Sequence, residues 1–186
     1  MAGGEYSHET AMLSEDLEHQ QLRVLLLIGA VSKVPGNGNK LDGLTKLAKL
    51  DFIARYQEAE PSVAAKLSGD TATTSHKSSI SITTTPMIRY RYGPWDDRYY
   101  PVIGALVGRG LVCYTRGKRG SVAMSVTALG RKIIQQLEKD DLWAPVAARY
   151  MSVADRFGAR SGNSLKEAVY AALPELMDVP LGTELT

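Results

Sequence analysis

Cysteine, aromatic residues and long apolar runs are all scarce in this chain of 186 residues. Its single cysteine, Cys113, excludes a disulfide framework and favours a reducing compartment, so we expect a cytoplasmic protein. The longest apolar run, Val24 to Val31, has eight residues, whereas a membrane-spanning helix needs roughly 20. The acidic start of the chain also differs from a signal peptide, which begins basic and then turns apolar. We therefore expect no membrane association.

Patterns that support catalysis or metal binding are missing as well. The three histidines, His8, His19 and His76, have no His or Cys at the spacing of metal ligands. Gly117-Lys118 is followed by arginine, where a phosphate-binding loop needs Ser or Thr. Cys113 lies inside a predicted strand, where we expect buried packing rather than a nucleophile. The sequence therefore predicts no enzyme activity, no metal and no cofactor.

The middle of the chain shows the order strand, helix, hairpin, helix. Met87 to Tyr92 alternates like a strand, and Gly93-Pro94 should end it. Apolar residues at helical spacing follow from Trp95 to Gly108, and Pro101 should bend or restart this helix near Tyr100. The sequence here predicts one face of a helix packed on a core.

A hairpin and a capped helix are predicted next. Leu111 to Arg116 and Ser121 to Val126 have strand composition, and Gly117-Lys118-Arg119-Gly120 between them is a turn with a cationic tip. Thr127 can cap a helix that continues to Leu137. Helix, hairpin and helix in this order predict a winged helix-turn-helix fold.

The flanking segments complete the expected organisation. Residues 1–13 read as a flexible leader, and Ser14 should begin a helix that is apolar nearly all round and therefore central. A helix from Leu41 to Tyr56 should expose Lys46, Lys49 and Arg55 as a solvated face. A further short helix should run from Ser62 to Leu67 and close at Gly69.

Two more segments define the domain boundaries. Residues 70–85 hold Ser or Thr at 10 of 16 positions, which predicts a mobile insert with an edge strand at its end. Residues 140–186 read as a C-terminal helical hairpin, whose apolar stripe must pack on the rest of the chain or on another chain. The predicted fold is α+β and mostly α, with the winged-helix domain at 14–139.

Positive charge concentrates in the central module. Residues 87–139 carry ten Lys and Arg against three Asp and Glu, a formal charge of +7, although the whole chain is only +2. Arg116, Lys118 and Arg119 at the hairpin tip are candidates for phosphate contact, and Arg98 is a candidate for base contact. A solvated turn is the competing interpretation of the tip. The helix from Trp95 has no Asn or Gln to read adenine, so sequence-specific readout is doubtful.

Aromatic residues gather in the same module. They form a candidate partner interface, because aromatic and arginine clusters are typical of protein interfaces, although part of the cluster must belong to the core. The candidate residues are Tyr90, Tyr92, Trp95, Tyr99 and Tyr100.

Three segments resemble a known family. Leu41 to Phe52, Met87 to Asp96 and Leu106 to Val112 resemble the middle components of bacterial three-component systems built on SMC-like ABC ATPases, to which the Lamassu anti-phage systems belong. The block Tyr92-Gly93-Pro94-Trp95-Asp96 is the most specific part. The resemblance implies a non-enzymatic accessory subunit that bridges the ATPase and an effector such as a nuclease, with non-specific contact to double-stranded DNA as a further expectation.

Two other functions stay open from the sequence. A winged helix with a basic module also fits a DNA-binding transcriptional regulator. An antitoxin-like inhibitor of a neighbouring toxin is the third interpretation.

Overall fold

The computed structural model describes residues 5–69 and 86–185, with residues 5–16, 119, 176 and 177 described by their backbone only. The chain is α+β and mostly helical, as predicted, with two small three-stranded sheets. The Ser/Thr-rich insert, 70–85, lies outside the described residues, so the predictions made for it have no counterpart here. Among the described helices, none combines the length and apolarity that crossing a bilayer requires.

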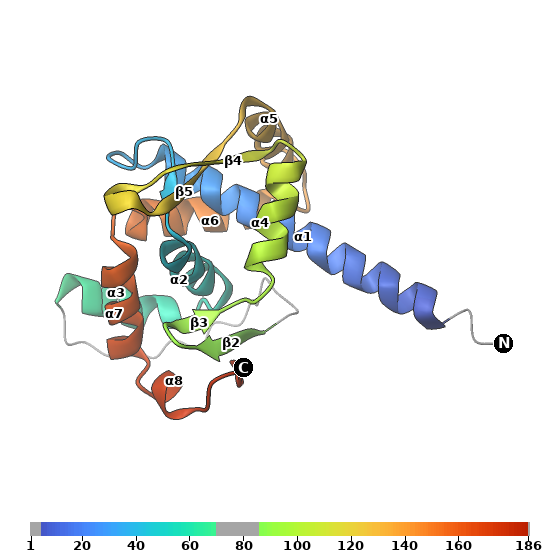
Figure 1. The fold of residues 1–186 in the computed structure, drawn as a ribbon. Coiled ribbons are helices and arrows are strands. Elements are labelled where there is room, and N and C mark those ends of the chain that lie inside the picture. Colours follow the sequence, from blue (N-terminus) through green and yellow to red (C-terminus); the bar gives the residue numbers. More distant parts are fainter. Residues whose placement is uncertain (1–4, 70–85, 186) are drawn as a thin grey trace.

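Helix α1 (Glu5–Lys33) is the centre of the core, as its all-round apolar pattern predicts. Val24, Leu25, Leu27 and Ile28 are fully buried, and α1 contacts helices and a strand on several sides. The predicted start at Ser14 was wrong, because the helix begins at Glu5 and runs through the expected boundary of a flexible leader at residue 13. Figure 1 shows the N-terminal part of α1 extending beyond the rest of the molecule.

Strand β1 (Leu41–Asp42) and helix α2 (Leu44–Arg55) occupy the region predicted as one helix. Gly43 separates them with a φ of 87°, which a side chain rarely adopts. Helix α3 (Ala59–Ser68) follows and ends at Gly69 in the left-handed conformation, which confirms the predicted stop. This arrangement gives the first sheet its short edge strand.

The predicted solvated face of α2 was wrong. Lys46, Lys49 and Arg55 are all buried. Their face is covered by the C-terminal helices, which pack on α2 from about a hundred residues further along the chain. Spacing within α2 could not foresee this covering.

The predicted hairpin is confirmed. Strands β4 (Val112–Arg116) and β5 (Val122–Val126) pair antiparallel, and β1 joins β5 on its other edge, so the sheet order is β1-β5-β4. A short 3-10 turn, η1 (Lys118–Gly120), lies between them. Cys113 of β4 is exposed, so the expectation of buried packing was wrong.

Helix α5 (Ala128–Leu137) follows the hairpin, and its predicted cap is confirmed. The Thr127 hydroxyl oxygen accepts a hydrogen bond from the backbone N–H of Gly130 at 3.1 Å. Ile134 and Leu137 are buried beside the hairpin and α1. The Thr127 cap, which lies next to the helix in the sequence, therefore determines where α5 begins.

The second sheet has the order β3-β2-β6, formed by β2 (Met87–Tyr90), β3 (Gly93–Trp95) and β6 (Glu184–Leu185). The prediction that Gly93-Pro94 ends the strand was wrong, because these residues begin β3 after a tight turn. Proline is tolerated there because β3 is an edge strand. Strand β6 pairs antiparallel with β2, so the last described residues lie beside β2 (Figure 1).

Helix α4 (Tyr99–Gly108) starts four residues later than predicted. Pro101 consequently falls in the first turn, where its missing N–H has no partner to lose. The backbone N–H of Val102 donates to the carbonyl of Arg98 at 2.9 Å. Of the two expected alternatives near Tyr100, a bend or a restart, the structure therefore shows a helix that begins there.

Helices α6 (Ala144–Phe157), α7 (Gly162–Ala172) and α8 (Glu175–Asp178) complete the fold. Ser161 caps α7 by accepting from the backbone N–H of Ser164 at 3.1 Å. Helix α6 packs on α1 and α2, and α7 packs on α2 and α3. The C-terminal helices thus pack on the rest of the chain, which is the first of the two predicted alternatives.

Candidate functional site

The cationic hairpin tip is held against β1. The two carboxylate oxygens of Asp42 accept from the backbone N–H of Lys118 at 2.8 Å and from the Ser121 hydroxyl at 2.6 Å. The Lys40 ammonium donates to the carbonyl of Arg116 at 2.7 Å. Burial raises the pKa of Asp42, but these hydrogen bonds and the nearby lysines outweigh it and hold that pKa below its ordinary value.

The hairpin tip therefore presents several cations on an anchored turn. Arg116 and Lys118 are exposed there, and the half-buried Lys40, which sequence reasoning missed, lies beside them. The backbone of Arg119 lies in the same turn, and its side chain is outside the described atoms. Such a group can contact phosphates without reading sequence.

Arg98 is not part of this cationic group. Its Nε and Nη2 donate to the two carboxylate oxygens of Asp96 at 3.0 and 2.9 Å. Burial would raise the pKa of Asp96, but Arg98 and Arg55 keep it below its ordinary value. Arg98 therefore serves the start of α4 and is already engaged by a buried carboxylate.

Helix α4 exposes a face without charge. Tyr100 is 65% exposed, and Pro101, Gly104 and Gly108 are also exposed. The ten residues of α4 include no Lys, Arg, Asn or Gln. The helix that leads into the hairpin therefore has none of the side chains that make bidentate contacts to base edges in a groove of DNA.

An apolar groove lies between α4, the hairpin and the start of α2. Its volume is about 420 Å³. Its lining residues are Leu44, Tyr100, Ile103, Tyr114, Val122 and Met124. We call it the α4–hairpin groove.

The walls of the α4–hairpin groove are open to solvent. Tyr114 is 56% exposed and Val122 is 59% exposed, which is unusual for large apolar side chains next to each other. Arg116 is the cross-strand partner of Val122, so it lies on the same face of the hairpin and borders the groove. The groove thus combines apolar walls with a cationic end.

The predicted aromatic interface divides into two parts. The Trp95 ring lies 5.5 Å from that of Tyr90 and 6.0 Å from that of Tyr100, between ring centroids. Because Tyr100 also lines the groove, this cluster continues it. Tyr92 is exposed in the turn before β3.

Tyr99 belongs to the interior and not to an interface. It is completely buried, and its hydroxyl donates to Asp51 at 2.7 Å. Its ring meets the Trp95 ring edge to face, with centroids 5.2 Å apart. The predicted surface role of Tyr99 was therefore wrong, since helical position 99 faces α1 and α2.

Sequence reasoning missed a buried polar network that holds α4 in place. Asp51 accepts hydrogen bonds from the hydroxyls of Tyr99 and Tyr150, the latter at 2.6 Å. Asp96 accepts from the Gln20 amide at 2.6 Å and from Arg55 at 3.0 Å. Burial first, and then the charge of Asp51, raises the pKa of both tyrosines well above 10.

This network connects four helices and has a structural role. Gln20 comes from α1, Asp51 and Arg55 from α2, Tyr99 from α4 and Tyr150 from α6. All five are buried, and none of them lines either described cavity. The network can therefore orient α4 for a partner, but it offers no access for a substrate.

The Gly93-Pro94-Trp95-Asp96 block is also explained by packing. Gly93 has a φ of 90°, and a Cβ built there would lie 2.7 Å from a ring carbon of Tyr170. The Pro94 carbonyl accepts from the Lys49 ammonium at 2.8 Å. Trp95 joins the aromatic cluster, and Asp96 joins the buried network. Each residue of the block therefore has a specific structural partner.

Within the residues that the structure describes, no three His, Cys, Asp or Glu side chains lie together as a metal site. Comparisons with protein-family models, with curated proteins and with solved structures found no match for this chain.

Proposed function

We propose that this chain is a non-enzymatic winged-helix subunit of a bacterial anti-phage complex of the Lamassu type, where it bridges an SMC-like ABC ATPase and an effector such as a nuclease. The winged-helix interpretation is supported by the helix α4, hairpin and helix α5 in succession, and by the sheet order β1-β5-β4. The proposed compartment is the cytoplasm, where the free, exposed thiol of Cys113 would stay reduced.

The observation that carries this proposal is the open α4–hairpin groove, whose lining has no charged side chain and whose border carries Arg116. A helix that reads DNA needs polar side chains on its exposed face, whereas α4 offers Tyr100, Pro101 and two glycines. Large aromatic and aliphatic side chains beside an arginine are instead typical of protein interfaces. The groove supports docking of a protein, and the buried network below α4 supports a rigid docking surface.

Co-expression with the ATPase and effector encoded beside this chain tests the proposal. We expect the three proteins to purify together, and we expect the double variant Tyr114→Ser with Val122→Ser to lose at least one partner. Both residues are exposed, so the variant should fold normally. Leu142→Ser is the matched control, because Leu142 is 76% exposed and lies outside the groove. Failure of wild-type co-purification would contradict the bridging role.

A DNA-binding transcriptional regulator is the second candidate function. It is favoured by the cations at the hairpin tip, Lys40, Arg116 and Lys118, on a turn anchored by Asp42. A regulator should retard a specific promoter fragment at physiological salt in the absence of any partner protein. Retardation that does not depend on DNA sequence would favour the subunit with non-specific contact.

A further inference from the structure

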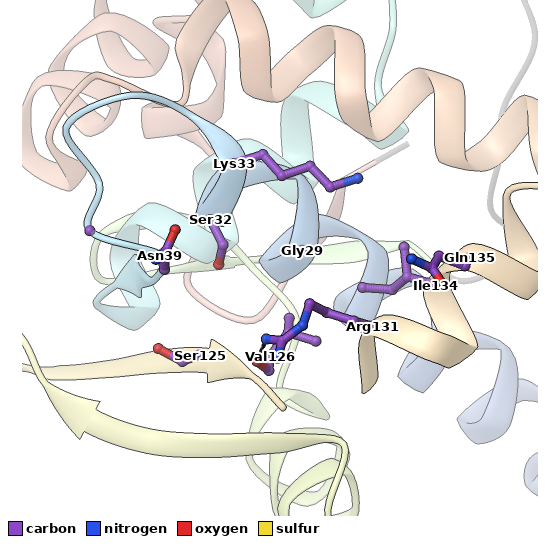
Figure 2. Close-up of a pocket in the computed structure, with 10 residues that line it drawn as sticks. Gly29, Ser32, Lys33, Asn39, Ser125, Val126, Arg131, Ile134 and Gln135 are labelled. Atoms are coloured by element: carbon purple, nitrogen blue, oxygen red, sulfur yellow. Dashed lines mark hydrogen bonds between the residues drawn. The ribbon is translucent and has the colours of Figure 1, made fainter. Parts of the chain in front are cut away.

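A second cavity, of about 370 Å³, opens between the end of α1, the loop after it, strand β5 and helix α5. Figure 2 shows the side chains around it coming from these four segments, with Lys33 from α1 and Arg131 from α5. It shares no lining residue with the α4–hairpin groove. We call it the α1–α5 cleft.

The lining of the α1–α5 cleft is cationic. Lys33 and Arg131 contribute positive charge, Asn39, Ser125 and Gln135 contribute neutral hydrogen-bonding groups, and no carboxylate lines the cleft. The Ser32 hydroxyl also lines it but donates its proton to the carbonyl of Ile28 at 2.7 Å. One guanidinium nitrogen of Arg131, Nη1, donates to the carbonyl of Val126 at 2.9 Å, which places the group against the end of β5. Within the part of the chain that the structure describes, this is its only hydrogen bond, so further donors stay available for a ligand.

Lys33 forms a solvent-exposed ion pair with Glu138 beside the α1–α5 cleft. Its ammonium lies 3.1 Å from a carboxylate oxygen of Glu138. The side chains are 62% and 28% exposed, so solvent screens the pair and its contribution to stability is small. An anion with more charge than one carboxylate can therefore compete for Lys33.

The loop beside the cleft has an uncommon backbone conformation. Gly36, Gly38 and Asn39 have φ values of 84°, 61° and 58°, and Asn39 is the only non-glycine residue with positive φ among the residues described. Gly38 and Asn39 line the cleft, so the backbone of this loop forms part of its wall. Asn37 fixes this loop by donating from its side-chain amide to the carbonyls of Val31 and Gly158, both at 2.9 Å.

We propose that the α1–α5 cleft binds a phosphate group. An ammonium, a guanidinium and several neutral donors without a lining carboxylate match the several oxygens and the charge of phosphate. No aromatic side chain lines the cleft, so it has no surface on which a nucleobase would stack. The bound group is therefore the phosphate itself, carried by a small phosphate ester or by a nucleic-acid backbone. This inference is independent of the function proposed above.

Nuclear magnetic resonance on the labelled full chain tests the site. Inorganic phosphate should produce saturable shifts of the backbone amides of Asn39, Ser125 and Gln135. Lys33→Met and Arg131→Met should each weaken this binding by roughly tenfold, as expected for loss of a charge-assisted hydrogen bond. Glu138→Gln should strengthen binding, because it frees Lys33 from its competitor.

Matched controls and probes complete the experiment. Lys132→Met removes a neighbouring exposed cation on α5 that does not line the cleft, and it should leave the affinity unchanged. Adenosine monophosphate and a 12-base-pair duplex are the other two probes. Tighter binding of the nucleotide than of phosphate would assign the site to a small ester, and duplex-only binding through the same residues would assign it to a nucleic-acid backbone. If no probe gives saturable shifts, or if Lys132→Met weakens binding as much as Arg131→Met, the proposal is wrong.

Discussion

The guanidinium of Arg55 lies 3.0 Å from the carboxylate of Asp96, and both side chains are almost completely removed from solvent. This ion pair joins the last turn of α2 to the segment just before α4. Because both charges are desolvated, each depends on the other and on the surrounding hydrogen bonds. The pair therefore sets the position from which α4 presents Tyr100 to the groove.

Removing Arg55 should destabilise the fold strongly. Arg55→Leu removes the buried ion-pair partner of Asp51 and one of the two cations that pair with Asp96, the other being Arg98, so we expect a loss of about 3 to 5 kcal/mol in the free energy of unfolding. Urea denaturation followed by circular dichroism measures it. Arg109→Leu breaks an exposed pair with Glu18, with side chains 54% and 59% exposed, and should cost less than about 1 kcal/mol. Equal losses in the two variants would contradict the role of the buried network.

Lys49 should make stability depend on pH. Burial, and then the charge of Lys166, lowers the pKa of Lys49 from 10.5 to about 7. Between these values the unfolded chain binds a proton that the folded chain does not, so stability rises with pH, by up to about 1.4 kcal/mol per pH unit. The resulting gain in the free energy of unfolding is complete near pH 10.5 and is lost as the pH falls to about 7.

Lys49→Met tests this dependence. The variant should be more stable than the wild type at pH 7, and its stability should change less between pH 7 and 9.5. Denaturant titrations at several pH values within this window measure both effects, because Tyr99 and Tyr150 ionise only above it. A variant with the same slope as the wild type would show that Lys49 is charged in the folded protein.

Replacing either of two glycines by alanine should change the stability of the fold, in opposite directions at the two positions. Gly93→Ala should destabilise by more than about 1 kcal/mol, because its φ is 90° and the new methyl group would lie 2.7 Å from Tyr170. Gly104→Ala should stabilise by about 0.5 to 1 kcal/mol, because Gly104 is inside α4 with open space around it. Thermal unfolding distinguishes them. A loss of stability in Gly104→Ala would mean that the exposed face of α4 is packed.

Any DNA binding through the hairpin tip should depend on salt. Replacing Arg116, Lys118 and Arg119 by alanine should reduce the slope of log affinity against log salt by up to about 0.9 for each lost phosphate contact. Fluorescence anisotropy with a labelled duplex at several salt concentrations gives this slope. Arg98→Ala is the comparison, because Arg98 is bound to Asp96 and should not change the slope. An unchanged slope in the triple variant would place any DNA contact elsewhere.

Local features of the fold were predictable from the sequence. The hairpin, the Thr127 cap, the stop at Gly69 and the buried centre of α1 each depend on residues that are neighbours in the chain. Turn glycines, capping hydroxyls and apolar spacing act within a few residues, so they can be read without knowing what packs nearby. The exposed cations Arg116 and Lys118 follow from the same local logic.

The sequence by itself determined where the hairpin and most helices lie, whereas the tertiary structure decided which of their side chains are buried. Lys49 and Arg55 have the spacing of an exposed face, yet helices from the far end of the chain cover them. Tyr99 and Tyr100 are adjacent and chemically identical, but one bonds Asp51 inside and the other lines the groove. Burial depends on contacts between distant segments, and local spacing does not encode which segments meet.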